Sequence, residues 1–410
     1  MVKKILWLWT VVAVSAAFLT VLPVPAHAQK ILEEFQKPLP EHKWEVMPQE
    51  EFEASTVLHE EVPLGDEALS YKIRLPEGWE QPQDVGISSY TLSDKLLGEI
   101  AVFYGPPKMY TRSRFTLEAL ALEYQLTAEQ WFIQHLLRNG YTIQGMEVIS
   151  DKRVEALFLV VEKDVTYVVR AVAEINGKRA VLAQYFLPTQ YWDDEKVIQS
   201  EVMKSFTLLR PDTEDAEDMN TFYILDIAEF QYPSSWELKT EPVRSIDRLE
   251  VEIRSSAKRK RIKQKDDWKK TREQREREQD ERTLHGRINI QLVSNFAAES
   301  LEDEIAKLKN KVLGTSLVAG NVIEAQDAFI YDDAISFGET NVYEAVDEES
   351  ELLKYEIWFT VMGAGDYYYF VTLLTPSRDD DFFVWSRNTQ TYKFVVENLT
   401  LQTDSLSTEE

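Results

Sequence analysis

VEALFLVVEKDVTYVVRAVAEINGKRAVLAQYFLP, residues 154–188, decides the fold, because a similar stretch returns about 190 residues later as NVYEAVDEESELLKYEIWFTVMGAGDYYYFVTLLTP, residues 341–376. Each copy predicts three strands, since apolar and polar residues alternate and β-branched or aromatic residues are frequent. A tight turn joins the last two strands, at Asn176-Gly177 in the first copy and at residues 363–366 in the second. We therefore expect one folding unit written twice, with these strands as the central hairpins of two sheets.

Composition limits the classes of function. The chain has 45 basic and 71 acidic residues, and its net charge of −26 opposes nonspecific binding to nucleic acid or anionic lipid by the whole molecule. There is no cysteine, which excludes disulfides, thiolate metal sites and lipid attachment through an N-terminal cysteine. The five histidines are scattered, and no HExxH, GxSxG, SxxK or phosphate-binding loop is present. We expect no enzyme, no cofactor, no metal and no nucleic-acid partner.

The N-terminus predicts a secretory signal peptide, residues 1–28. Lys3 and Lys4 precede the apolar run ILWLWTVVAVSAAFLTVL, and Ala26-His27-Ala28 supplies a small-residue cleavage site. The run is 18 residues long, just enough to span a bilayer, so an uncleaved N-terminal membrane anchor is the alternative. The mature protein is expected to be exported and periplasmic.

Composition also predicts the domain division. Residues 29–60 are rich in Pro and Glu with few apolar anchors, which is typical of a partly disordered lead-in. Residues 211–220, PDTEDAEDMN, are acidic without apolar anchors and are expected to link two domains. The expected division is signal peptide 1–28, acidic and Pro-rich lead-in 29–60, first domain 61–210, acidic linker 211–220, second domain 221–403 with a charged helical insertion 254–286, and tail 404–410.

A Pro-x-x-Trp turn follows the opening strand of each copy. The strand at 69–75 ends in LPEGWE, and its echo at 227–232 ends in YPSSWE. Proline stops a strand and favours a turn, so a Trp three residues later is placed to fold over the end of the sheet. We interpret both tryptophans as core-capping side chains rather than ligand sites, since large aromatic side chains mostly fill cores. The residues of this structural motif are Pro76, Trp79, Pro233 and Trp236.

Along the sequence, one helix is predicted before the three strands of the first copy and another after them. The clearest one opens at Thr127, with Gln130 in capping-box spacing, and another at 193–205 closes the copy. A helical region is expected to begin already at Thr116. His135 lies on the apolar face of the clearest helix and is expected to pack rather than catalyse, because no Cys, Ser or Asp partner stands at a motif spacing.

The second copy repeats this order. A helix capped by Ser300 carries an apolar stripe and stops at Gly314, and a last helix is expected near 380–397. The expected fold class is α+β, with two tandem α/β/α sandwich domains, each a mainly antiparallel sheet flanked by helices.

With this order of elements, each copy resembles the PsbP, Mog1 and DcrB superfamily of α/β/α sandwiches. The resemblance rests on the strand ending in LPEGW or YPSSW, the capped helix, the three strands and the closing helix. Members are typically non-enzymatic binding or assembly factors, among them photosystem subunits, a nucleotide-release factor for a small GTPase and bacterial envelope proteins. The resemblance implies such a role here. Many bacterial members are lipoproteins, and this chain departs from them because it has no cysteine.

A strongly basic segment occurs in the second copy and has no counterpart in the first. Residues 254–287 contain fourteen Lys or Arg against seven Asp or Glu and few apolar residues, which predicts an exposed helical arm. One hypothesis is a solvated extension. The other is a partner-binding arm that docks on an anionic membrane, an acidic partner or an acidic polymer. Its candidate binding residues are Lys258, Arg259, Lys260, Arg261, Lys263, Lys265, Trp268, Lys269 and Lys270.

Two further patterns favour structural roles. Residues 379–381 are three aspartates, but they lack the EF-hand spacing and are interpreted as the charged start of the last helix. Residues 367–369 are three tyrosines, which cannot all face one side of a strand and are interpreted as sheet packing.

These patterns favour a non-enzymatic, exported protein-binding or assembly factor of the bacterial envelope. The partner is expected to be an envelope protein. The alternatives are a small-molecule or lipid carrier, which needs an apolar cavity, and a carboxylate- or metal-dependent hydrolase with its site between the domains.

Overall fold

The computed structural model describes residues 34–40, 47–82, 98–240, 245–257, 284–314, 317–327, 335–347 and 354–401. The predicted signal peptide, residues 258–283 of the predicted insertion and the predicted tail lie outside the described residues. In the described part of the chain, no helix is long and apolar enough to cross a membrane.

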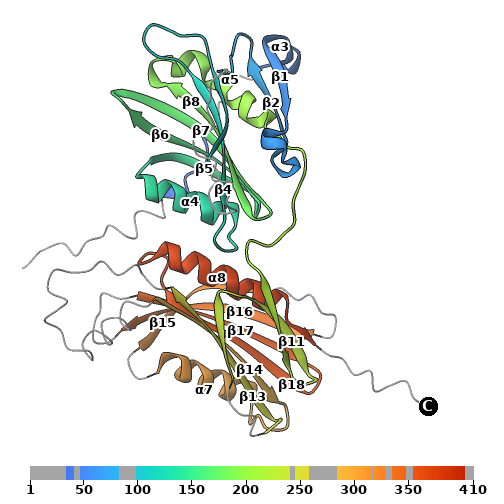
Figure 1. Cartoon of the computed structure of the whole chain (residues 1–410). Coiled ribbons are helices and arrows are strands. Elements are labelled where there is room, and N and C mark those ends of the chain that lie inside the picture. Colours follow the sequence, from blue (N-terminus) through green and yellow to red (C-terminus); the bar gives the residue numbers. More distant parts are fainter. Residues whose placement is uncertain are drawn as a thin grey trace, which may run out of the picture.

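The first region of the chain contains two antiparallel sheets (Figure 1). One has six strands in the order β3-β4-β8-β7-β6-β5, and the other has three in the order β1-β2-β9. Helices α4 and α5 pack against opposite faces of the six-stranded sheet, each with its own cluster of buried side chains. The elements are α3 (Gln49–Ser55), β1 (Thr56–Glu61), η1 (Pro63–Gly65), η2 (Glu67–Leu69), β2 (Tyr71–Pro76), β3 (Glu99–Tyr104), β4 (Arg114–Ala121), α4 (Ala128–Asn139), β5 (Thr142–Ser150), β6 (Arg153–Glu162), β7 (Val165–Asn176), β8 (Arg179–Pro188), η3 (Thr189–Tyr191), α5 (Trp192–Ser205) and β9 (Thr207–Leu208).

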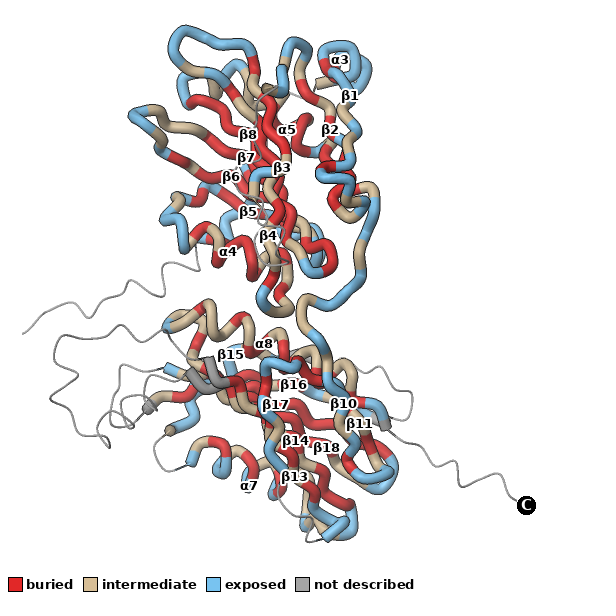
Figure 2. Tube along the Cα trace, viewed as in Figure 1, coloured by how far each residue is buried: buried red, intermediate tan, exposed pale blue. Residues whose placement is uncertain are grey.

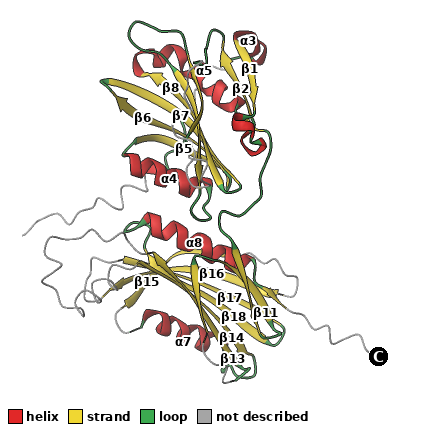
Figure 3. Cartoon of the chain, in the orientation of Figure 1, coloured by secondary structure: helices red, strands yellow, loops and turns green. Residues whose placement is uncertain are grey.

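The second region has the same composition of layers. A seven-stranded sheet has the order β12-β13-β14-β18-β17-β16-β15, and a three-stranded sheet has the order β10-β11-β19. Helix α7 covers one face of the seven-stranded sheet and α8 covers the other (Figure 3). The elements are β10 (Met219–Ile224), β11 (Ala228–Pro233), β12 (Trp236–Thr240), β13 (Arg248–Ala257), β14 (Leu284–Ser294), α7 (Leu301–Leu313), β15 (Leu317–Asp327), β16 (Ile335–Asp347), β17 (Lys354–Ala364), β18 (Tyr367–Pro376), α8 (Phe382–Glu397) and β19 (Thr400–Leu401).

The two regions repeat one another in strand order. From β13 to β15, the second large sheet follows the order of the first from β3 to β5, and β12 is an additional edge strand. The register agrees as well, since Arg114 opposes Phe186 on β8 as Arg287 opposes Leu374 on β18. The structure therefore shows an α+β fold of antiparallel sheets flanked by helices, as the sequence predicted.

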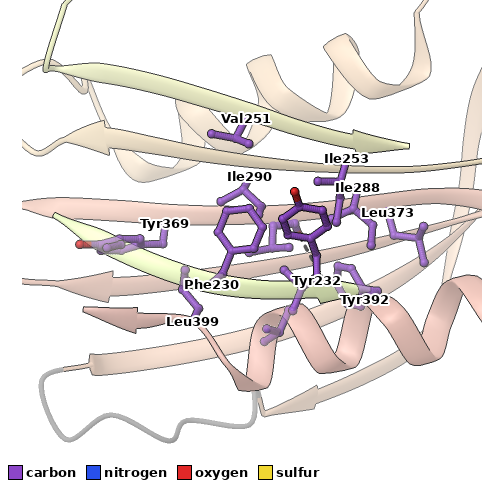
Figure 4. Packing of buried hydrophobic residues seen from close by; sticks show 14 of the residues in the cluster. Phe230, Tyr232, Val251, Ile253, Ile288, Ile290, Tyr369, Leu373, Tyr392 and Leu399 are labelled. Atoms are coloured by element: carbon purple, nitrogen blue, oxygen red, sulfur yellow. Dashed lines mark hydrogen bonds between the residues drawn. The ribbon is translucent and has the colours of Figure 1, made fainter. Parts of the chain in front are cut away.

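The core of the second region lies between its large sheet and α8. Phe230 and Tyr232 of β11 face Ile290 of β14 and Leu373 of β18, and Tyr392 approaches from α8 (Figure 4). The alternation of side chains along each strand brings these residues to one face, and burial of such large apolar groups stabilises the layer packing.

Local sequence signals set the ends of the helices. The Thr127 side chain accepts a hydrogen bond from the Gln130 backbone N–H at 3.2 Å, and the Gln130 side chain accepts one from the Thr127 backbone N–H. Helix α4 is capped at its C-terminus by Gly140, whose φ is 65°. The Ser300 side chain accepts from the backbone N–H of Asp303 at 3.1 Å and caps α7. These predicted caps are confirmed.

The helical region predicted from Thr116 is wrong. Residues 114–121 form strand β4, which pairs with β8 along its whole length. Phe115, Leu117 and Ala119 are fully buried against α5, because every second residue of a strand faces the same layer. Pairing between distant strands thus overrides the helix propensity of this Leu- and Ala-rich segment.

Three predicted boundaries also need correction. Residues 49–60, assigned to the lead-in, belong to α3 and β1, because Phe52 is buried in the core and β1 pairs with β2. Strand β10 begins at Met219, inside the predicted linker, where it pairs with β11. The predicted insertion is too wide, since β13 continues to Ala257 and pairs there with Leu284 of β14.

The two regions touch through α4 and α8, which lie side by side in Figure 1. The Gln134 side chain donates a hydrogen bond to the Ser386 hydroxyl at 2.7 Å, and both residues are buried. The Arg138 guanidinium lies 5.0 Å from the centre of the Phe383 ring. Phe382 belongs to the same buried cluster as the apolar face of α4, so an apolar contact and a polar one hold this joint together.

Candidate interaction surface

His135, the histidine considered for catalysis, is packed among aromatic rings. Its ring stacks on Trp131 at 5.3 Å and on Phe132 at 6.1 Å. Burial and, to a smaller extent, the positive charge of the nearby Arg138 together lower the pKa of His135 to about 4. A neutral imidazole between rings is a packing group at neutral pH, as the sequence led us to expect.

The tryptophans of the Pro-x-x-Trp turns lie at the ends of sheets. Trp79 follows β2, packs against the first core and lies 5.0 Å from the Tyr185 ring, centre to centre. Trp236 starts β12 and is 3 % exposed within the second core. Both prolines end their strands, Pro76 in β2 and Pro233 in β11. These positions agree with the core-capping interpretation.

The aspartate and tyrosine runs are also parts of the framework. The Asp381 side chain accepts from the Val384 backbone N–H at 3.2 Å and caps α8. Tyr367 and Tyr369 pack toward the α8 side of the sheet, whereas Tyr368 packs toward the α7 side. Among the described residues, no group of three or more His, Asp or Glu side chains is placed to hold a metal ion.

The predicted basic arm joins two paired strand ends. Its binding candidates, from Lys258 to Lys270 including Trp268, lie outside the described residues. The flanking residues Ala257 and Leu284 are partners in the β13–β14 ladder. The arm thus connects the two strands of one antiparallel hairpin.

A short hairpin between β3 and β4 presents two apolar side chains to solvent. We call residues 105–113, GPPKMYTRS, the finger. The backbones of Lys108 and Thr111 exchange two hydrogen bonds, 2.8 and 3.1 Å long, so that Met109 and Tyr110 form a two-residue tip. Met109 is 88 % exposed and Tyr110 is fully exposed at 102 %. Side chains this open leave their apolar surface available to a partner, and its burial in an interface would be favourable.

The tip has a backbone conformation that its residues do not favour. Met109 has φ of 54°, in the left-handed region that side chains with a Cβ seldom adopt. The conformation costs on the order of 1 kcal/mol for a residue other than glycine. Pro106 and Pro107 precede the tip and restrict its backbone further. Surrounding contacts must therefore hold the tip in place.

Those contacts come from η3 and the start of α5. The Gln190 side chain donates to Thr111 Oγ1 at 2.8 Å, and the Tyr191 hydroxyl donates to the Lys108 carbonyl at 3.2 Å. Glu195 of α5 pairs with the Lys108 ammonium and accepts from the Ser113 hydroxyl at 3.3 Å. The first region therefore fixes the shape of the finger before any partner arrives.

The base of the finger rests on aromatic side chains. The Arg112 guanidinium lies 3.7 Å from the centre of the Tyr104 ring. A Cβ on Gly105 would stand 3.1 Å from Trp79, so glycine allows the tryptophan to approach the backbone closely. Trp79 of the predicted motif thus supports the finger as well as the core.

The finger lies away from the joint between the regions. It adjoins the start of β4, at Arg114, whereas the other end of β4 leads through Tyr124 to the contact with α8. Figure 2 shows exposed segments at this end of the first region, where β8 leads into α5. A partner can reach the finger without displacing the second region.

Sequence reasoning did not single out the finger. A Pro-Pro pair followed by Lys-Met-Tyr-Thr between two strand-like stretches was the available signal. This pattern does not indicate a hairpin when a helix is predicted from Thr116, because a hairpin needs a strand on each side. The exposure of Met109 and Tyr110 follows only from the pairing of Lys108 with Thr111.

No protein-family model and no curated protein sequence matches the chain. Among solved structures, cyanobacterial PsbP from Synechocystis is 15 % identical, covering 38 % of this chain and 93 % of its own, with a TM-score of 0.28. The Ran-binding protein Mog1p from Saccharomyces cerevisiae is 9 % identical, covering 38 % and 97 %, with a TM-score of 0.28. The immunity protein TplEi from Pseudomonas aeruginosa is 10 % identical and covers 85 % and 98 %, with a TM-score of 0.21. Likenesses at this level say nothing about binding or activity.

Proposed function

We propose that the protein is a non-enzymatic binding factor of the bacterial envelope, built of two tandem PsbP- or Mog1-like domains and exported to the periplasm. Its first domain recognises a partner protein through the finger. The observation that carries the proposal is the fully exposed Met109-Tyr110 tip, held in an unfavourable conformation by its surroundings. Strain that the surrounding structure maintains is typical of functional positions.

The chemistry of the tip suits a protein partner. Tyrosine and methionine are enriched in the buried centres of protein interfaces, and a rigid tip loses little conformational entropy on binding. Asp193 and Asp194 in the first turn of α5 lie close to Glu195, and their charges oppose insertion of the finger into an anionic bilayer.

The basic arm between Ala257 and Leu284 supplies a second, electrostatic contact with an anionic membrane, partner or polymer in this proposal. Each basic residue near an anionic surface contributes roughly 1 kcal/mol, and salt weakens the attraction. The two contacts are separable, since the finger belongs to the first region and the arm to the second.

Photo-crosslinking tests the finger. A benzophenone amino acid replaces Tyr110, or Tyr223 as a control on the second region that is 59 % exposed. The protein is produced in its own bacterium and irradiated in intact cells. We expect one discrete adduct from position 110 and none from position 223, and competition by co-produced wild-type protein but not by co-produced Tyr110→Ser.

Other outcomes overturn the proposal. Equal adducts from both positions, or competition by Tyr110→Ser as good as by wild type, mean that the finger is not recognised. Deletion of residues 258–283 provides the second arm of the test. If only this deletion removes the partner, the contact lies in the basic arm, and if no partner is found, the carrier and hydrolase alternatives take precedence.

A further inference from the structure

The loop through which the first region contacts the second has a counterpart in the second region, at the end away from that contact. Residues 122–126 connect β4 to the cap of α4, and residues 295–299 connect β14 to the cap of α7 with the same length. The Leu122 N–H donates to the Lys178 carbonyl at 2.9 Å, and the Asn295 N–H donates to the Asp366 carbonyl at 2.8 Å. The two loops are therefore equivalent parts of the repeated fold.

In the first region this loop binds a helix. Tyr124 holds the Arg387 guanidinium of α8 at 4.8 Å from its ring centre. Gln125 accepts from the Ala216 backbone N–H at 2.8 Å. The adjoining helix α4 completes the contact through Gln134 and Ser386. A helix with an arginine thus covers this end of the first region.

In the second region the equivalent loop is exposed and carries a large apolar side chain. Phe296 is 88 % exposed, and Ile246, which precedes β13, is 62 % exposed. The Tyr367 hydroxyl donates to the Ile246 carbonyl at 3.4 Å, which places Ile246 beside the β17–β18 turn, and the Asn295 N–H bonds to the same turn. Two exposed apolar side chains therefore share this end of the sheet.

The loop is as firmly held as its counterpart. The Phe296 N–H donates to Ser294 Oγ at 3.3 Å, and the Ala297 N–H donates to the Ser294 carbonyl at 2.9 Å. Arg248 donates to the Ala297 carbonyl at 3.2 Å while it makes a bidentate pair with Glu304, at 2.7 and 2.8 Å. Phe296 is thus presented on a fixed backbone.

The charges around Phe296 define the partner. Residues 295–304 carry four carboxylates, Glu299, Glu302, Asp303 and Glu304, against two basic side chains that contact this segment, Arg248 and Lys307, so acidic charge is in excess. Carboxylates around an apolar centre attract a basic surface and repel an acidic one. A second copy is disfavoured, because α5, the counterpart of α8 in the repeat, begins with three acidic residues. An anionic membrane is disfavoured for the same reason.

We infer that the Phe296 surface, made of Ile246 and residues 295–303, binds a helix of a partner protein that carries basic side chains. The helix takes the place that α8 with Arg387 takes on the first region. This contact is independent of the finger and lies in the other region. With both contacts, the protein bridges two partners.

Peptide binding tests the inference on the full mature chain. The probe is a synthetic amphipathic helix with leucines on one face and lysines and arginines on the other, and the control peptide has glutamates in place of the basic residues. Binding is followed by fluorescence anisotropy at low and at physiological salt. Phe296→Ser is compared with Val161→Ser, a similarly exposed position in the first region at 71 %.

We expect the basic helix to bind the wild type and Val161→Ser equally, and Phe296→Ser about tenfold more weakly or worse, the loss expected for a central aromatic anchor. Neither substitution changes the charge, so nonspecific attraction to an acidic protein predicts no difference between them. Equal affinity of Phe296→Ser, or equal binding of the acidic peptide, overturns the inference.

Two further measurements cover the other occupants of this surface. Sedimentation of the wild type shows whether it self-associates, and a dimer lost in Phe296→Ser assigns the surface to a second copy and overturns the inference. Flotation with anionic phosphatidylglycerol vesicles that depends on Phe296 makes it a membrane contact and also overturns it.

Discussion

The Gln134 side chain on α4 donates its hydrogen bond to the Ser386 hydroxyl on α8 across 2.7 Å, between two residues that are 2 % and 0 % exposed. The residues are 252 positions apart in the chain. This bond lies within an apolar contact formed by Phe382 and the buried face of α4. The hydrogen bond is directional and the apolar contact around it is extended, and together they fix the orientation of the two regions.

Gln134→Ala should loosen the joint without unfolding either region. Loss of a buried hydrogen bond costs about 1 kcal/mol, and Ser386 keeps its bond to the Phe382 carbonyl. Limited proteolysis should cut faster between residues 211 and 218. The control is Gln144→Ala at an exposed position, and equal cutting rates in both variants contradict this role of the bond.

His135 should make stability depend on pH. Its pKa is lowered from the ordinary histidine value of 6.5 to about 4 in the folded protein, so the unfolded chain binds the proton more readily between these values. The contribution of His135 to stability is fully present above about pH 6.5. It is lost as the pH falls toward 4, by roughly 1.4 kcal/mol per pH unit at most. Urea unfolding from pH 7 to 4.5 should show this slope, and His135→Phe should remove that part of it.

Glu304 should make stability depend on pH in a more acidic range than His135 does. The hydrogen bond from Arg248 is the main reason that the pKa of Glu304 falls to about 2, so its stabilisation is present above the unfolded value and lost as the pH drops from about 4.5 to 2. Arg248→Met should destabilise by about 2 kcal/mol at pH 7. The difference from wild type, measured by thermal unfolding, should shrink toward pH 2, and a constant difference argues against ionic pairing as its cause.

Glu356→Leu should severely destabilise the second region. The carboxylate is 2 % exposed and accepts from Arg378 Nε at 2.8 Å, Trp385 Nε1 at 2.7 Å and Trp358 Nε1 at 3.1 Å. Removing one partner of a buried ion pair costs about 3–5 kcal/mol. Near-ultraviolet circular dichroism with urea should report the early loss of tryptophan packing, whereas Glu324→Leu, at the edge of the same network, should cost far less.

Met109→Gly should separate stability from binding. Glycine accepts the positive φ at the tip, so the variant should be up to about 1 kcal/mol more stable than wild type. The photo-adduct from position 110 should weaken because the tip loses its methionine and part of its rigidity. A variant that is less stable than wild type shows that Met109 makes a packing contribution, and an unchanged adduct shows that methionine is not recognised.

Sequence patterns were reliable where the signal was local. The hairpins around Asn176-Gly177 and Gly365 follow from turn residues between alternating stretches, and the helix caps Thr127 and Ser300 follow from side chains that bond within three residues. Strand β4 was missed because its Leu- and Ala-rich residues also fit a helix. Its conformation is decided by β8, which lies far along the chain.

The candidate surfaces depend on contacts that sequence spacing does not reveal. Tyr110 is exposed because a ladder places it at a turn, and the finger is fixed by Glu195, which comes from a distant helix. The role of Phe296 is recognised only when the register identifies its loop as the equivalent of the loop that carries Tyr124. Apolar residues at such positions look in the sequence like ordinary core residues.

The β13–β14 hairpin has a broader consequence. Ala257 and Leu284 remain partners on either side of a long connection, so the sheet is closed below whatever segment lies between them. The entropy of closing a loop grows only slowly with its length. This hairpin is therefore a position where a reporter domain can be inserted while the strand register stays unchanged.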